Sequence, residues 1–178
     1  HMSRTYTPLR YPGGKARFAP FIARLIERNQ LIGSHYLEPY AGGAGIAFYL
    51  LFNGYVTHIH INDIDPAIAD FWKAITQETS SFIELLERTP VTLEQWGKWR
   101  NILKRETKAT LVERGFSTFF MNRTNRSGIL NAGVIGGKDQ TGSYKIDARY
   151  NKITLIERIK QISKYADRIS IYNEDALS

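Results

Sequence analysis

Apolar and polar positions along the chain alternate between short runs typical of strands and longer runs with helical spacing. Strand patterns occur at 36–38, 58–62 and 168–172. Helical spacing is found at 16–29, 46–52, 66–75, from 80 onward, 93–104, 110–121 and from 151 onward. Strands that alternate with helices indicate a parallel sheet with helices packed on it. The pattern therefore predicts an α/β fold.

Signals for helix ends support these boundaries. Asp65 before Pro66 predicts a capped helix start, and Asn151 predicts another. Ser80 and Ser81 also have the pattern of a capped start. We expect the last helix to bury Ile153, Ile156, Ile159 and Ile162, and the central helices to bury Trp96, Trp99, Leu103, Phe116, Phe119 and Phe120.

A glycine-rich turn follows the first strand, with Gly42, Gly43 and Gly45 leading into a helix. Glycines let bare backbone approach a ligand, although an ordinary tight connection has the same composition. Asp63 ends the second strand, 63 − 45 = 18 residues later, where carboxylates hold ribose in nucleotide-binding folds. The spacing matches neither a dinucleotide fingerprint nor a triphosphate-binding loop. Glu38 repels a pyrophosphate and favours a ligand with a positive centre, such as S-adenosylmethionine.

Two irregular segments carry further candidates. Residues 3–15 contain two prolines and two glycines, and place Tyr11 and Lys15 on either side of a tight turn, either to face a ligand or as an ordered arm. Residues 122–145 have no helical period and predict a long loop, which is functional or a mobile surface loop. Asparagine and arginine side chains pair with base edges, and basic ones bind phosphates. The candidates for DNA contact are Asn122, Arg123, Asn125, Arg126, Lys138 and Lys145.

The formal charge of +7 and pI near 9.6 favour a polyanionic partner, because eleven basic residues fall between 100 and 152. The absence of cysteine excludes disulfides and thiolate metal sites, and the four histidines lack ligand spacing, so no metal is expected. His58 and His60 are expected to be half-buried on a strand. No apolar run is long enough for a membrane span, and His1-Met2 has the form of a tag remnant. We expect a cytoplasmic protein without a membrane partner.

Four segments resemble the adenine-N6 DNA methyltransferases that place the cofactor-binding half first. They are 9–15, 38–45, 62–65 and 122–129. The resemblance implies a Rossmann-like class I methyltransferase fold with a partial sheet and a mostly helical DNA-recognition insertion. It implies a cofactor-binding domain at 3–76 and 151–178, and an insertion at 77–150. The implied cofactor is S-adenosylmethionine and the implied partner is double-stranded DNA.

Individual roles follow from the same resemblance. Tyr11 and Lys15 would contact the cofactor, the glycine turn would accommodate its methionine part, and Asp63 would hold its ribose. Asp175, or Glu174 beside it, would lie near its adenine. Arg123 and Arg126 would contact DNA. Such enzymes often have an aromatic residue where this chain has Arg126, so a stacking role there is not carried over.

The catalytic signature of that family, Asp or Asn followed by Pro-Pro and an aromatic residue, does not occur in this sequence. It accepts hydrogen bonds from the adenine amino group and stacks on the flipped base. No catalytic residue is therefore assigned. We expect the chain to be the N-terminal part of a longer enzyme whose C-terminal part is missing here, or one whose remainder is supplied separately, with a natural stand-alone fragment as the alternative. A catalytically inactive DNA-binding module, or a methyltransferase acting on RNA or a small molecule, are the alternatives.

Overall fold

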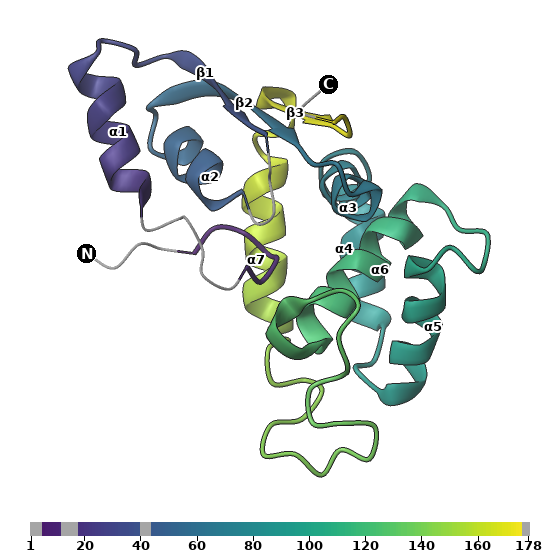
Figure 1. The fold of residues 1–178 in the computed structure, drawn as a ribbon. Coiled ribbons are helices and arrows are strands. Elements are labelled where there is room, and N and C mark those ends of the chain that lie inside the picture. The colour runs from purple at the N-terminus through teal and green to yellow at the C-terminus, as the bar shows by residue number, and fades with distance from the viewer. Residues whose placement is uncertain (1–4, 12–17, 40–43, 176–178) are drawn as a thin grey trace.

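A parallel sheet forms the upper part of the molecule in Figure 1. The computed structural model describes residues 5–11, 18–39 and 44–175. In this part of the chain the sheet has three strands in the order β1-β2-β3. They span Ser34–Glu38, Val56–Asn62 and Ile169–Tyr172, and every pairing is parallel. The α/β fold with a parallel sheet is confirmed.

The two faces of the sheet differ in how they are covered. Ile59 and Ile61 point to one face and are fully buried. Helix α2 (Gly45–Phe52) packs against β2, and Figure 1 shows α7 (Lys152–Ser163) on the same side. On the other face His58 and His60 are half-buried, as predicted.

A layer of helices extends from the β3 side of the sheet (Figure 1). Its members are α3 (Pro66–Gln77), α4 (Thr79–Arg88), α5 (Leu93–Leu103) and α6 (Leu111–Thr124). α3 and α5 both pack on α6, and α4 packs on α7. α1 (Ala19–Arg28) lies against α2 at the opposite end. Two short 3-10 turns, η2 (Arg126–Gly128) and η3 (Ala166–Arg168), complete the described elements.

Most of the predicted helix starts are confirmed. The Asp65 carboxylate accepts a hydrogen bond from Ala67 N at 2.9 Å, and the Asn151 side chain accepts one from Thr154 N at 3.1 Å. The helix predicted to start at Ser80-Ser81 is present as α4, but its start has no side-chain cap. α3 ends at Gln77 and α4 begins at Thr79, so only Glu78 separates the two helices. The Thr79 hydroxyl donates to Ile75 O at 2.6 Å and does not cap α4.

Two predictions about helix faces and ends are wrong. Ile153 is 75% exposed, because positions three apart drift around a helix with 3.6 residues per turn. The buried positions of α7 are Leu155, Ile159 and Ile162. α6 continues through Thr124, whereas the sequence predicts a loop from Asn122. Tertiary hydrogen bonds described below hold these last residues in the helix.

The aromatic side chains on α5 and α6 build the interior. Trp99, Phe116, Phe119 and Phe120 are buried as predicted, while Trp96 and Leu103 are only partly buried. A single hydrophobic cluster runs from the sheet through α3 to α6 and α7. The division into a cofactor-binding domain and an insertion at 77–150 stays a prediction. The helices between residues 77 and 150 share one hydrophobic core with the sheet.

Candidate functional site

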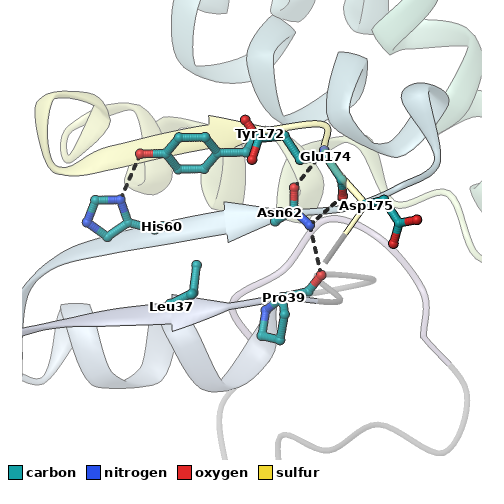
Figure 2. A pocket seen from close by; sticks show the side chains of 7 residues that line it. All are labelled: Leu37, Pro39, His60, Asn62, Tyr172, Glu174 and Asp175. Atoms are coloured by element: carbon teal, nitrogen blue, oxygen red, sulfur yellow. Dashed lines mark hydrogen bonds between the residues drawn. The ribbon is translucent and has the colours of Figure 1, made fainter. Parts of the chain in front are cut away.

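Asn62, at the end of β2, joins the ends of all three strands. Its side-chain nitrogen donates to Pro39 O at 3.1 Å and to Glu174 O at 2.9 Å, and its oxygen accepts from Glu174 N at 2.9 Å (Figure 2). The side chain is buried. Three hydrogen bonds of this kind fix the segments after β1 and β3 relative to β2. The sequence patterns assign no role to Asn62, although a polar residue at the end of a buried strand is a feature that could have identified it as a candidate.

Asp63 lies at the same edge, next to the segment that follows β3. Its backbone nitrogen donates to Tyr172 O at 3.2 Å, and Asn173 Nδ2 donates to Asp63 O at 2.8 Å. The Asp63 carboxylate accepts from Asp65 N at 2.9 Å, which holds its turn in place. The prediction that residues 173–175 reach the sheet edge of Asp63 is confirmed.

A pocket of about 470 Å³ opens at this edge. Leu37 and Pro39 line it from β1 and the residue after it, while the carboxylate residues Glu174 and Asp175 line it from beyond β3 (Figure 2). His60, Asn62 and Tyr172 complete the lining. Apolar surface beside carboxylates suits a flat ring and polar or cationic groups. Crevices at the carboxyl ends of parallel strands are where open α/β sheets bind ligands.

Glu38 is oriented by a neighbour on the same strand. The Tyr36 hydroxyl donates to Glu38 Oε2 at 3.1 Å. Burial, and then the Glu38 carboxylate, raise the pKa of Tyr36, so its hydroxyl remains a neutral donor. Glu38 pairs with Ile61, which places it on the face of the sheet covered by α2.

The remaining cofactor candidates are placed only in part. Lys15, Gly42 and Gly43 lie outside the described residues. Tyr11 is 54% exposed, and Gly45 is the first residue of α2. At the start of this helix Ala44 has a φ of 51°, a left-handed conformation that costs energy for any residue with a Cβ. Within the described part of the turn, Ala44 rather than Gly45 has the positive φ.

A row of aromatic rings continues from the pocket across the open sheet face. His60 Nδ1 lies 3.1 Å from the Tyr172 hydroxyl, and His60 Nε2 lies 3.0 Å from His35 Nδ1. The His35 ring stacks on that of His58 at 4.5 Å. Burial, and then His35 and His58, lower the pKa of His60, which favours the neutral ring at neutral pH.

The chemistry of this edge excludes some ligands and favours others. Among the described residues no group of three or more His, Asp or Glu side chains is arranged to hold a metal ion. Four carboxylates gather around the strand ends, at Glu38, Asp63, Glu174 and Asp175. Such a site disfavours phosphates and suits a ligand with a positive centre. The residues therefore fit the cofactor that the sequence predicts.

Comparison with known proteins decides the family. A family model described as D12 class N6 adenine-specific DNA methyltransferase matches residues 11–178. The chain belongs to this family. Enzymes of this D12 class act on DNA, so adenine-specific DNA methylation is the activity of the family. A search of curated proteins found no match to the chain.

Three of the six DNA-contact candidates in this D12 chain point inward. The side chains of Asn122, Arg123 and Asn125 are buried. Asn122 bonds both backbone groups of Arg10, with Arg10 N donating at 2.7 Å and Arg10 O accepting at 2.9 Å. Arg123 Nε donates to Pro8 O at 2.8 Å. A role for these three residues in DNA contact stays a prediction, and the side chains of Asn122 and Arg123 bond residues 5–11, here called the N-terminal arm.

Asn125 has an equally internal set of partners. Its side-chain oxygen accepts from Trp96 Nε1 at 2.7 Å, and its nitrogen donates to Ile129 O and Leu130 O. The Arg10 guanidinium donates to Asn125 O at 2.9 Å. Asn125 thus connects α5, the N-terminal arm and the start of residues 126–150, here called the recognition loop.

The other three candidates lie on the recognition loop. Arg126 and Lys138 are exposed. Lys145 is exposed too, but its ammonium donates to Gln140 O at 2.6 Å and Gly142 O at 3.0 Å, bracing the loop itself. The Gln140 side-chain nitrogen donates to Ile135 O at 2.8 Å, and the Gln140 side-chain oxygen accepts a hydrogen bond from Ile146 N at 2.9 Å. The loop is irregular, as predicted, but internally cross-linked.

The helices of the described chain are all too short or too polar to cross a membrane. A cytoplasmic location stays a prediction.

Proposed function

We propose that this D12 chain is the part of an adenine-N6 DNA methyltransferase that binds S-adenosylmethionine and recognises DNA. The observation that carries the proposal is the pocket at the carboxyl ends of β1, β2 and β3, which is lined by apolar groups and carboxylates. A site of this charge favours a sulfonium cofactor over a nucleoside phosphate.

The described residues divide naturally between parts of that cofactor. Asp63 lies at the end of the second strand, where a carboxylate accepts hydrogen bonds from ribose hydroxyls. Glu174 and Asp175 line the pocket beside it and would face the adenine ring, with Leu37 and Pro39 as apolar contacts. Tyr11, Lys15, Glu38 and the turn with Gly42, Gly43 and Gly45 would enclose the methionine part. When bound, the cofactor supplies the methyl group on its sulfonium.

The N-terminal arm would connect the cofactor site to the DNA site. Its residues Thr7, Pro8 and Leu9 are buried, and α6 bonds the backbone of Arg10 and Pro8. Tyr11 follows immediately and is exposed. The same end of α6 begins the recognition loop. We therefore assign Asn122, Arg123 and Asn125 to positioning Tyr11 relative to the loop, and Arg126 and Lys138 to DNA contact.

Alignment of the target adenine would come from residues outside the present sequence. The 178 residues contain no two consecutive prolines, and so no Asp-Pro-Pro-aromatic element. Within the described chain β1 pairs only with β2, and Leu37 on β1 is 61% exposed. The outer edge of a strand such as β1, beside the pocket, can accept another parallel strand. The same observations favour the second candidate, a DNA-binding module that does not transfer methyl groups.

Transfer of a labelled methyl group tests the proposal. The protein is incubated with labelled S-adenosylmethionine and duplex DNA, alone and together with a polypeptide that carries the missing element. RNA and free adenosine serve as parallel substrates. We expect cofactor binding in both cases and adenine-N6 label in duplex DNA only when the element is present. Salt-sensitive DNA binding without any cofactor binding supports the inactive module instead.

A further inference from the structure

His60 lines the pocket at the strand ends, together with Tyr172 from the neighbouring strand (Figure 2). Its ring is half-buried on the open face of the sheet. Histidine is the side chain whose charge ordinarily changes near neutral pH, so a histidine in a pocket wall lets pH alter the charge that a ligand meets. The proposed ligand of this pocket, S-adenosylmethionine, has a positive charge on its sulfur. His60 is therefore placed where its proton affects binding.

Both ring nitrogens of His60 have partners on neighbouring strands. Nδ1 lies 3.1 Å from the Tyr172 hydroxyl on β3, and Nε2 lies 3.0 Å from His35 Nδ1 on β1. The rings of His60 and Tyr172 also stack, with centroids 5.9 Å apart. These contacts hold the imidazole in one orientation, so a change in its charge acts at a fixed position beside the pocket.

The contact between His60 and His35 limits how the two rings take up protons. A hydrogen bond between two ring nitrogens requires one of them to lack a proton. While the 3.0 Å bond is intact, the pair therefore carries at most one positive charge. Burial first, and then His35 and His58, lower the pKa of His60, which keeps its ring neutral at neutral pH. Acidification then adds a charge to the wall of the pocket.

The titratable groups around His60 come from all three strands. Histidines lie near it on β1 and β2, a tyrosine contacts it from β3, and two carboxylates line the pocket beyond β3. They are His35, His58, Tyr172, Glu174 and Asp175. The carboxylates attract a cationic ligand, and a proton on His60 opposes that attraction. The charge of His60 thus decides how acidic the pocket is.

We propose that the protonation state of His60 sets how strongly the pocket prefers S-adenosylmethionine over its demethylated product, an inference that rests on the proposed cofactor site. The product, S-adenosylhomocysteine, has the same adenosine and amino-acid parts but a neutral thioether in place of the sulfonium. A proton on His60 repels the sulfonium and acts much less on the thioether. As the pH falls, the pocket therefore loses its preference for the methyl donor.

Calorimetry with both ligands at pH 8.0 and pH 5.0 tests this inference. For the unchanged protein we expect the affinity for S-adenosylmethionine to fall about threefold or more at the lower pH, and the affinity for S-adenosylhomocysteine to change less. His60→Gln keeps a hydrogen-bonding side chain without a titrating proton, so both ligands should show the same pH dependence. His58→Gln is the matched control, since it lies on the same strand but outside the pocket lining, and should keep the larger response to S-adenosylmethionine.

An NMR titration of the His60 ring needs no variant, so it remains informative if His60→Gln fails to fold. Linkage requires that a ligand whose binding is weakened by a proton also lowers the pKa of the group that takes up this proton. We expect the pKa of His60 to be lower with S-adenosylmethionine bound than with S-adenosylhomocysteine bound. Equal pKa values of His60 with the two ligands overturn the inference.

Failure of the inference and failure of the cofactor site give different results. If neither ligand binds at pH 8.0, the proposed cofactor site is wrong, and the role of His60 is wrong with it. If both ligands bind with parallel pH responses in the unchanged protein, the site stands and the role of His60 is overturned. A response specific to S-adenosylmethionine that persists in His60→Gln also overturns it, because another group then supplies the titrating charge.

Discussion

Asn62 shows how much of the site one buried side chain can position. It bonds Pro39 and Glu174, which are 23 and 112 residues away in sequence. Periodicity and spacing identify Asp63, because its place after a strand is a local feature. They do not identify Asn62, because its role depends on where Glu174 folds. The same limit applies to Asn122 and Arg123: their residue types suit base contact, but the sequence does not show that their side chains bond the N-terminal arm.

Replacement of Asn62 should therefore weaken both the fold and the pocket. Asn62→Ala removes three part-buried hydrogen bonds to the backbone of Pro39 and Glu174, each of which contributes about 0.5–1.5 kcal/mol. Urea unfolding should show a loss of about 2–5 kcal/mol in the free energy of unfolding. Asn53→Ala, an exposed asparagine after α2, is the control. Equal stability of the two variants contradicts the role given to Asn62.

His60 predicts how stability depends on pH. Its pKa in the folded protein is lowered from 6.5 by burial, His35 and His58. The unfolded chain therefore binds a proton at a pH where folded His60 does not, so stability is full above 6.5 and decreases as the pH falls through the folded pKa. Urea unfolding at pH 7.5 and 5.5 should show a smaller loss for His60→Gln than for the unchanged protein. An identical loss in both contradicts the account.

At the scale of elements, the contact between α3 and α6 depends on one glycine. A Cβ at Gly115 would lie 2.5 Å from Ala74 Cβ and 2.8 Å from Asp70 O, both on α3. The helices approach this closely because position 115 has no side chain. The helical pattern predicted α6, but nothing in it indicated that a glycine sets the distance between two helices.

Gly115→Ala should thus separate the helices and lower the free energy of unfolding by about 1–3 kcal/mol, as for other overpacked cores. Gly97→Ala on α5 is the matched control, since a Cβ there meets nothing within 4 Å. It should stabilise the protein by about 0.5–1 kcal/mol, the usual preference of helices for alanine over glycine. Thermal or urea unfolding measures both, and a stabilised Gly115→Ala variant contradicts the close contact.

The recognition loop gives a prediction about DNA. A Cβ at Gly133 would collide with the Nη2 atom of Arg126, a flexible side chain that can move away. Gly133→Ala should therefore fold normally but displace Arg126, with about a tenfold loss of affinity for duplex DNA if this arginine makes a charged hydrogen bond.

The double variant separates this effect from a general disturbance of the loop. Arg126→Ala should cause the same loss alone, and Gly133→Ala should add nothing to it, because both remove one contact. Gly97→Ala again serves as control and should bind DNA normally. Additive losses from Gly133→Ala and Arg126→Ala show that Gly133 acts through another part of the loop.

For the whole molecule, the sequence predicts the fold better than it predicts which charged side chains face solvent. Strand and helix patterns and two helix caps are local, and they gave the parallel sheet and most element boundaries. The basic segment between residues 100 and 152 looked like a surface for DNA, but several of its cations have internal partners. Arg105 and Arg114 pair with Asp70, and Lys152 donates to Glu87 O and Thr89 O. Composition counts charges, and only tertiary structure shows which ones face solvent.

We propose that the cofactor binds at the acidic edge where the three strands end. Binding of S-adenosylmethionine to the protein, measured by calorimetry for the unchanged chain and for Asp63→Asn, tests it most directly. Asparagine can keep the bond from Asp65 N but loses the charge of the carboxylate. Asp139→Asn, on the recognition loop, is the control. We predict that Asp63→Asn weakens cofactor binding about tenfold or more while Asp139→Asn does not. Equal cofactor affinity of the Asp63→Asn variant and the unchanged protein would contradict the site.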